Sequence, residues 1–386
     1  MNTHPPAVVL APDSFKGSLD AAAVCSAMSE GLRRVWPDAR IRSRPMADGG
    51  EGTLDAVLAA VGEAGRRSSL NVQGAGDHSI PAAWGLLTRP EGSVAVIESA
   101  QVVGITDADG MRVPVAARST RGVGQLVRAV LESGVRRFMI GLGGTSTNDG
   151  GAGMLCALGL RLLDANGRSV EPTPAGLAAL ASVDATSIDP RLREIDVTIM
   201  SDVSNPLCGP RGATAIFGPQ KGVSDRDRED IDRALARFAT LAESAMGQAV
   251  AHLPGAGAAG GLGFALQLVG GRFASGARVV ADLIGLDDAM RDADWAITGE
   301  GRTDAQTLLG KAPFIVAETA ARARVPISLL SGALDARALP DLGARFAGCF
   351  ALPDAPATLA ECIANAAPSL ANRAEQMARL FDAARR

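Results

Sequence analysis

The stretch from Gly141 to Gly153 reads GLGGTSTNDGGAG and lies between two apolar runs, 138–140 and 154–158. This order predicts a strand, a loop and then a helix. Six glycines in thirteen residues leave the backbone amides open to a phosphate, and the following helix N-terminus adds partial positive charge. The polar groups of the loop belong to Thr145, Ser146, Thr147, Asn148 and Asp149. A tight turn is the alternative, but this density of polar groups favours an anion or substrate site.

The composition is that of a globular chain. With 386 residues, 47% hydrophobic and 21% charged, the sequence predicts two or three domains with large cores. The net charge of −4, without a basic block or a long apolar run, argues against nucleic-acid binding and membrane insertion. The N-terminus lacks a signal-peptide pattern and the five cysteines are scattered, so we expect a cytoplasmic protein. Three histidines argue against a histidine-based mechanism.

The N-terminal segment alternates strands and helices. Its predicted strands and helices, in order, are 7–10, 20–35, 41–45 and 54–61. Such an order forms parallel sheets, whose ligands lie at the carboxyl ends of the strands. Polar loops follow both strands, PDSFKGSL at 12–19 and MADGGEGT at 46–53, so Lys16 is expected near Asp48 and Glu51. A plain surface cluster of ion pairs is the alternative.

From about residue 71 the pattern changes to short apolar runs separated by turns, which predicts antiparallel strands. Glu98 ends one run and is either a site residue or an ordinary charged strand end. Asn166-Gly167 indicates a hairpin or edge element. The predicted strand 195–200 ends at SDVSNPLCG, which puts Asp202 where strand meets loop.

The segment PGAGAAGGLGFAL, 254–266, contains the spacing Gly255-x-Gly257-x-x-Gly260. Taken alone, this spacing resembles a dinucleotide fingerprint. However, Pro254 precedes it directly and no clear strand leads into it, so a helix start that approaches another backbone or a phosphate is the better interpretation.

After residue 294 the α/β pattern returns, with a predicted strand at 295–298, the polar loop GEGRTDAQTLLGKAP and a helix. Because the C-terminal pattern matches the N-terminal one, the sequence predicts a discontinuous parallel α/β domain with a second α/β domain inserted. The expected boundaries are 1–66 plus 285–386 for the discontinuous domain and 67–284 for the insertion.

Glycine loops, strand-end carboxylates and scattered lysines together indicate phosphoryl transfer, which depends on positioning and charge neutralisation. The carboxylates Asp149, Asp202, Glu300 and Asp304 could hold Mg²⁺ or accept a proton. The sequence has neither a P-loop nor the protein-kinase motifs: Ala312 follows Gly310-Lys311, and Ala305 stands at the position of the first P-loop glycine.

The chain closely resembles the bacterial glycerate kinase family from about residue 8 to 332. The motifs that carry the resemblance are APDSFKGSL (11–19), PMADGGEGT (45–53), GLGGTSTNDGGAGM (141–154), DVSNPLCG (202–209), FGPQKG (217–222), PGAGAAGGLG (254–263) and TGEGRTDAQTLLGKAP (298–313). Departures are small: Thr145-Ser146 stands where the family usually has Ser-Ala, Arg121 where an aromatic is common, and Ser201 where Cys is frequent.

The resemblance implies a Rossmann-like domain with an inserted domain and a glycerate 2-kinase that uses ATP and Mg²⁺ on D-glycerate in glyoxylate or glucarate catabolism. The sequence itself leaves the phosphorylated hydroxyl open, and the oligomeric state open between monomer and homodimer.

The chemistry of the loops, rather than the family, suggests the roles of individual residues. We expect catalysis by Asp202, Lys16 and Asp304. We expect substrate binding by Asp13, Ser14, Lys16, Asp48, Glu51 and Arg302. We expect nucleotide binding by Gly143, Gly144, Thr145, Ser146, Thr147, Asn148, Gly257 and Lys311. We expect metal binding by Asp149, Asp202 and Glu300. The alternatives are a non-catalytic sensor of a phosphorylated acid and an NAD-dependent oxidoreductase.

Overall fold

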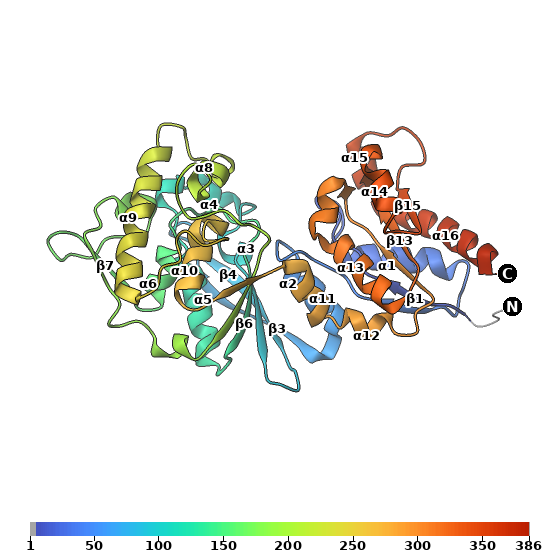
Figure 1. Cartoon of the computed structure of the whole chain (residues 1–386), viewed down its shortest axis with the longest axis horizontal. Helices are drawn as coiled ribbons and strands as arrows, with labels where there is room; N and C mark the ends of the chain where they lie inside the picture. Colours follow the sequence, from blue (N-terminus) through green and yellow to red (C-terminus); the bar gives the residue numbers. More distant parts are fainter. Residues whose placement is uncertain (1–4, 386) are drawn as a thin grey trace. The chain divides into compact units, whose positions relative to one another are not determined.

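The computed structural model describes residues 5–385, and these divide into two compact units. The first unit lies within residues 1–48, 55–62 and 277–386, and the second comprises 49–54 and 63–276. Figure 1 shows the blue N-terminal and the orange to red C-terminal elements gathered in one unit. Among the described residues, no helix has both the length and the apolar character needed to cross a membrane.

The first unit is built on a fully parallel sheet with the strand order β15-β13-β11-β1-β2. These strands are β1 (Ala7–Leu10), β2 (Arg40–Ser43), β11 (Trp295–Thr298), β13 (Ile327–Ser331) and β15 (Gly348–Ala351). The central strands are buried along their whole length, as parallel strands covered by helices must be. A minor parallel pair joins β12 (Arg302–Thr303) to β14 (Ala333–Leu334).

Most helices of the first unit bury apolar residues, whereas α15 has no buried residue. They are α1 (Ala21–Arg33), most of α2 (Thr53–Val61), α11 (Gly276–Leu283), α12 (Leu286–Met290), α13 (Ala312–Ala323), α14 (Leu339–Gly343), α15 (Leu359–Ala364) and α16 (Ala366–Arg385). Asp20 caps α1 by accepting from the Ala23 N–H. The last helix packs along α1, where Leu32 and Leu370 share one core (Figure 1).

The second unit is built on a mixed sheet with the order β10-β9-β6-β5-β4-β3. Its strands are β3 (Gly65–Gln73), β4 (Ser79–Leu87), β5 (Val94–Glu98), β6 (Arg137–Gly141), β9 (Asp196–Met200) and β10 (Arg272–Ala274). The first three are antiparallel, as predicted, whereas β5, β6, β9 and β10 are parallel. A hairpin turn at Asn166-Gly167 follows β7 (Arg161–Leu163), which pairs with β8 (Ser182–Asp184).

The helices of the second unit include α5, whose apolar face contacts α6 and β3 and belongs to the same core as β6. They are α3 (Ala100–Val103), α4 (Ala108–Arg112), α5 (Arg121–Glu132), α6 (Ala152–Ala157), α7 (Pro174–Leu177), α8 (Ala213–Phe217), α9 (Arg228–Met246) and α10 (Leu262–Leu268). The first sheet is parallel throughout, and the second is parallel over β5, β6, β9 and β10, so the polar loops that follow these strands meet at one edge of their own sheet. The mixed α/β class with parallel sheets is therefore confirmed.

Candidate active site

In the first unit, three polar loops converge at the carboxyl ends of β1, β2 and β11. Asp13 follows β1, and its N–H donates to the Gly299 carbonyl at 2.8 Å, which joins two of the loops. The side chain is only 8% exposed, and its Oδ1 accepts from the Ser14 N–H at 2.6 Å. Burial, reinforced by the negative charge of Asp48, raises the pKa of Asp13 to about 7. A carboxyl group with this pKa is suited to exchange protons near neutral pH.

Lys16 and Asp48 lie at the open side of this cluster. Their Nζ and Oδ2 atoms are 3.8 Å apart, and the Lys16 side chain is 72% exposed. An ion pair this exposed contributes little stability, so the ammonium group can turn to an anionic ligand at small cost. Lys16 is near Asp48 as predicted, whereas Glu51 is exposed and belongs to the second unit.

Glu300 follows β11 and is held by threonine hydroxyls. Its Oε1 accepts from Thr307 at 2.5 Å and from Thr303 at 3.1 Å, and the Thr303 hydroxyl lies 2.8 Å from that of Ser331. Burial raises the pKa of Glu300, although the nearby Lys311 charge opposes the shift. This hydroxyl network fixes one carboxylate oxygen and orients the other.

The remaining predicted residues of this loop are more exposed. Asp304 caps the short 3₁₀ turn 305–309 by accepting from the Gln306 N–H at 2.9 Å. This capping bond supplies a structural reason for Asp304 and weakens its assignment as a catalytic residue. Arg302 is exposed on β12, and Lys311 is the residue directly before α13.

In the second unit, the loop between β6 and α6 is exposed only at its beginning. Gly144 is exposed with φ +71°, and Gly143 is half-buried, whereas residues 145–149 are buried. Gly260 packs on this loop so closely that a Cβ there would lie 2.0 Å from the Thr147 carbonyl oxygen. Only the 143–144 end of the loop is therefore open to a ligand.

Gly257 is explained by packing. Its N–H donates to the Asn205 carbonyl at 2.9 Å, and a Cβ would lie 2.3 Å from the Pro206 carbonyl oxygen. The chain reaches Pro254 from α9 rather than from a strand, so this segment is not a dinucleotide fingerprint. The close backbone approach requires this glycine without any ligand.

Asp149 does not fit the expected metal site. Its Oδ2 accepts from the Thr120 N–H (2.7 Å), the Thr120 hydroxyl (2.8 Å) and the Gly153 N–H (3.1 Å), and its Oδ1 accepts from the Gly151 N–H (3.1 Å). The residue is fully buried, and that burial raises its pKa. Both oxygens are committed to holding the loop, so we remove Asp149 from the metal ligands.

Two buried cations lie behind the loop. The Arg118 guanidinium donates to the carbonyls of Val113, Met111, Ser146 and Lys221 at 2.8–3.0 Å. The Lys221 ammonium donates to the Thr147 carbonyl at 2.7 Å and lies 3.4 Å from the Thr145 hydroxyl. Both side chains are almost completely buried.

Glu98, at the end of β5, fixes the start of α2. It is 1% exposed and accepts from the Leu54 N–H at 2.5 Å and from the Gln101 amide at 3.2 Å. Burial raises the pKa of this carboxyl group. A structural role therefore accounts for Glu98.

The expected metal ligands do not form one cluster. Asp202, exposed two residues after β9, belongs to the second unit with Asp149, whereas Glu300 belongs to the first. Among the described residues, no group of three or more His, Cys, Asp or Glu side chains could hold a metal ion. Mg²⁺ bound with a nucleotide uses only one or two carboxylates together with phosphate oxygens and water. Asp202 or Glu300 alone could therefore supply the carboxylate ligand of such an ion.

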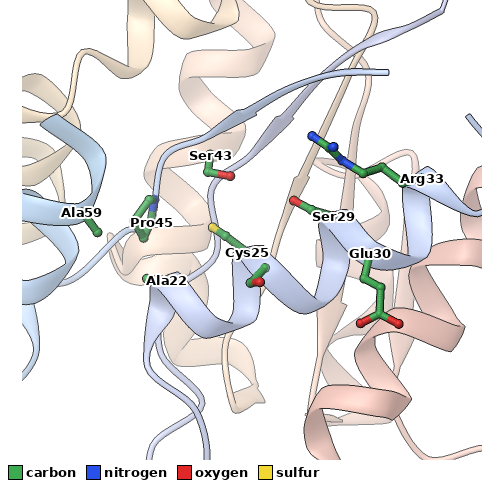
Figure 2. A pocket seen from close by; sticks show the side chains of 9 residues that line it. Ala22, Cys25, Ser29, Glu30, Arg33, Ser43, Pro45 and Ala59 are labelled. Carbon is green, nitrogen blue, oxygen red and sulfur yellow. The ribbon is translucent and has the colours of Figure 1, made fainter. Parts of the chain in front are cut away.

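A hollow of about 570 Å³ in the first unit lies against α1 and lacks the predicted site residues. Figure 2 shows Cys25 directed toward Ser43 and Pro45, whereas Glu30 points away from them. Glu30 already pairs with Arg34 at 2.6 Å. We assign this hollow no ligand.

Sequence reasoning missed the groups that hold the site residues in place. These groups are Arg118, Thr120, Thr303, Thr307 and Ser331, together with the structural position of Lys221. A lysine inside the glycine-containing segment FGPQKG was the one available signal.

The chain is similar in sequence to known proteins over most of its length. A sequence model described as the glycerate kinase family matches residues 8–382. The Escherichia coli K12 protein named glycerate 2-kinase is 40% identical over 328 residues, 85% of each chain. The Bacillus subtilis protein named glycerate kinase is 41% identical over 333 residues, also 85% of each chain.

A solved structure extends the likeness to the fold. A crystal structure from Salmonella typhimurium LT2, described as glycerate kinase 2, is 38% identical with a TM-score of 0.86, and the match covers 99% of this chain and 100% of that one. The chain therefore belongs to the glycerate kinase family, and it is an enzyme of that family.

Proposed function

We propose that the enzyme transfers the γ-phosphoryl group of ATP to D-glycerate and releases 2-phosphoglycerate. The observation that carries this proposal is the identity of 40% to the relative named glycerate 2-kinase, spread over 85% of both chains. The acid cluster of Asp13, Asp48 and Glu300, in which Asp13 and Glu300 are buried, supports it, because a hydroxyl nucleophile needs a nearby proton acceptor. The product would enter organic-acid catabolism.

We assign the general base to Asp13 rather than to Asp202. A glycerate hydroxyl must lose its proton as it attacks phosphorus, and an efficient base has a pKa near the working pH. Asp13 meets this requirement because burial raises its pKa to about 7. Asp202 is exposed and follows β9 in a polar loop.

The glycerate carboxylate would bind the cations of the first unit. Lys16 is exposed and weakly paired, and Arg302 can make a bidentate contact. Ser14 is half-buried next to Asp13 and could bond a substrate hydroxyl together with Asp48. Glu51 remains a weaker candidate, since it is exposed and belongs to the second unit.

The nucleotide phosphates would bind the open end of the glycine loop. Gly144 is exposed, whereas the half-buried Gly143 donates its N–H to the Gly49 carbonyl at 3.5 Å, a long bond that a phosphate would have to replace. The Thr145 hydroxyl follows Gly144 directly in the loop. In the first unit, Lys311 directly before α13 is the cation expected to bind the nucleotide. Ser146, Thr147 and Asn148 are fully buried and would support the loop rather than touch the nucleotide.

Asp202 in the second unit and Glu300 in the first are each a candidate ligand of Mg²⁺. Each has carboxylate oxygens of the kind that Mg²⁺ prefers, and Glu300 is oriented by two hydroxyls. When bound, Mg²⁺ would neutralise phosphate charge. Asp304 would shape the loop around Glu300 through its capping bond.

We also propose the finer organisation expected from the sequence. The second unit would be a domain inserted into a discontinuous Rossmann-like domain, in agreement with the segments 49–54 and 63–276. All five cysteines are free thiols, which fits a reducing compartment such as the cytoplasm. The enzyme would act as a monomer or homodimer.

The test is a turnover assay with D-glycerate, ATP and Mg²⁺. We expect stoichiometric ADP, and we expect NMR of the product to identify 2-phosphoglycerate. Formation of 3-phosphoglycerate would correct the position of transfer. Binding without ADP formation would favour the sensor alternative, and a glycerate-dependent change in nicotinamide absorbance would favour the oxidoreductase.

A further inference from the structure

Lys221 is a buried cation whose direct partners are neutral oxygens. It is 2% exposed, and its ammonium nitrogen lies 2.7 Å from the Thr147 carbonyl oxygen and 3.4 Å from Thr145 Oγ1. Asp149 and Arg118 are the charged groups that act on it electrostatically. Burial lowers the pKa of Lys221 to about 7, and the carbonyl and hydroxyl oxygens are the hydrogen-bond acceptors that hold its protonated form.

The contact with Thr145 determines what the threonine hydroxyl can do. An ammonium group has only donors, so Thr145 Oγ1 must accept from Lys221. The hydroxyl proton of Thr145 is then available to donate to another group. Thr145 is 5% exposed and directly follows Gly144, which is exposed, so an acceptor at the open end of the loop could receive that proton.

Arg118 and Lys221 also fix the direction of two peptide groups. The Ser146 carbonyl points to Arg118 at 2.9 Å, and the Thr147 carbonyl points to Lys221. Arg118 also donates to the Lys221 carbonyl at 2.9 Å, and this hydrogen bond anchors the backbone of the lysine itself. The cations thus form a rigid backing for residues 145–147, and the loop is held for a ligand before one binds.

We propose that Lys221 is a positioning residue for nucleotide binding, which sets Thr145 as a hydrogen-bond donor to a phosphate oxygen of ATP. This inference rests on the proposed function, because it takes the ligand of the loop to be a nucleotide phosphate. Lys221 acts through Thr145 and touches no substrate atom. Thr145 is the residue that contacts the phosphate.

A double-mutant cycle on the full-length enzyme tests this relationship. Thr145→Val removes the hydroxyl, and Lys221→Met removes the charge but keeps a side chain of similar length. A double variant carries both substitutions. Each single variant should raise KM for ATP roughly tenfold, as expected for a lost bond to a charged group. The double variant should show no more than the larger single effect, because both changes remove the same donor.

Matched variants separate positioning from folding. Arg136→Met removes another cation that donates to two carbonyls, those of Leu131 and Val135, before β6 begins. It should leave KM for ATP unchanged, and every variant should leave KM for glycerate within about twofold of the wild type. Thr145→Ser retains the hydroxyl and should restore the wild-type KM for ATP.

The outcomes are distinct. The inference would be overturned if the increase in KM for ATP in the double variant equals the product of the two single increases. A wild-type KM for ATP in Thr145→Val would overturn it as well. If Lys221→Met fails to fold, the difference in KM for ATP between Thr145→Val and Thr145→Ser decides whether the Thr145 hydroxyl contacts the phosphate. If the wild type does not phosphorylate glycerate, the proposed function fails, and calorimetric titration of the same variants with Mg·ADP still tests the phosphate contact. Absence of ADP binding by the wild type would overturn both.

Discussion

The Thr120 hydroxyl donates to Asp149 Oδ2 at 2.8 Å, and the Thr120 N–H donates to the same oxygen at 2.7 Å. The same hydroxyl accepts from the Met154 N–H at 3.0 Å. One threonine and one carboxylate therefore join the start of α5 to the start of α6. This arrangement makes Asp149 part of the frame of the glycine loop.

Asp149→Asn should lower stability without changing the metal requirement. An amide nitrogen cannot accept, so at least one of the four donors loses its acceptor whichever way the amide is turned, and each unsatisfied buried donor costs about 1–3 kcal/mol. We expect the free energy of unfolding, measured with urea, to fall by at least about 2 kcal/mol. The Mg²⁺ concentration for half-maximal activity should stay the same.

Asp164→Asn is the matched control for this prediction. Asp164 also accepts from two backbone N–H groups, those of Asn166 and Arg168, but in an exposed turn. The free energy of unfolding of Asp164→Asn should fall by no more than about 1 kcal/mol. A stable Asp149→Asn enzyme that needs more Mg²⁺ would return Asp149 to the metal ligands.

Gly144→Ala should impair nucleotide binding beyond its effect on stability. Gly144 has φ +71°, so an alanine there is strained by about 1–2 kcal/mol, but a Cβ would meet only Ala100 Cβ at 3.5 Å. The new methyl group would stand beside the exposed amide and should raise KM for ATP several-fold.

Gly134→Ala separates strain from ligand contact. Gly134 has φ +91° in the turn before β6, and a Cβ there would meet nothing within 4 Å. Both variants should lose similar stability by thermal unfolding. Equal KM values for ATP in the two variants would mean that the exposed amides do not contact the nucleotide.

Much of the fold could be predicted because apolar runs mark its strands. The run 138–140 predicts β6, and 295–298 predicts β11, since buried parallel strands are apolar on both faces. β10 and β15 escaped prediction because each is short and only partly buried along its length. Their pairing depends on the neighbouring strand rather than on their own composition.

The site was predictable at the level of loops, whereas the roles of its residues were not. Parallel strands bring Asp13, Asp48 and Glu300 into electrostatic contact, as the strand-end rule indicates. Nothing in the sequence distinguishes Asp13 from Asp202, because the difference between them is burial. Likewise, Asp149 resembles a metal ligand until its four donors are known.

Asp202→Asn should weaken use of the metal rather than the proton transfer step. If Asp202 holds Mg²⁺, the neutral amide should raise the Mg²⁺ concentration for half-maximal activity by about tenfold or more. Asp196→Asn is the control, because Asp196 is exposed at the opposite end of β9 and pairs with Arg272 at 2.7 Å. An unchanged Mg²⁺ requirement in Asp202→Asn would leave Glu300 as the remaining candidate.

Asp13 gives the sharpest prediction, because its protonation links activity to stability. Its pKa is raised from 3.8 to about 7, so the folded state binds this proton more tightly than the unfolded state. The resulting contribution to stability is complete below pH 3.8 and is lost as the pH rises through 7. Asp13→Asn should therefore raise Tm at pH 8 but not at pH 4, while kcat falls about 10²-fold or more.

Asp48→Asn tests the cause of the shift and the catalytic role together. The negative charge of Asp48 is the second contribution to the raised pKa of Asp13, after burial. In the wild type, kcat/KM for glycerate should rise through about pH 7 as Asp13 loses its proton. Removing the neighbouring charge lowers the pKa of Asp13, so the acidic limb of this profile should move to lower pH in Asp48→Asn. An acidic limb that stays in place would show that another group titrates, and Asp13 would lose its assignment as the base.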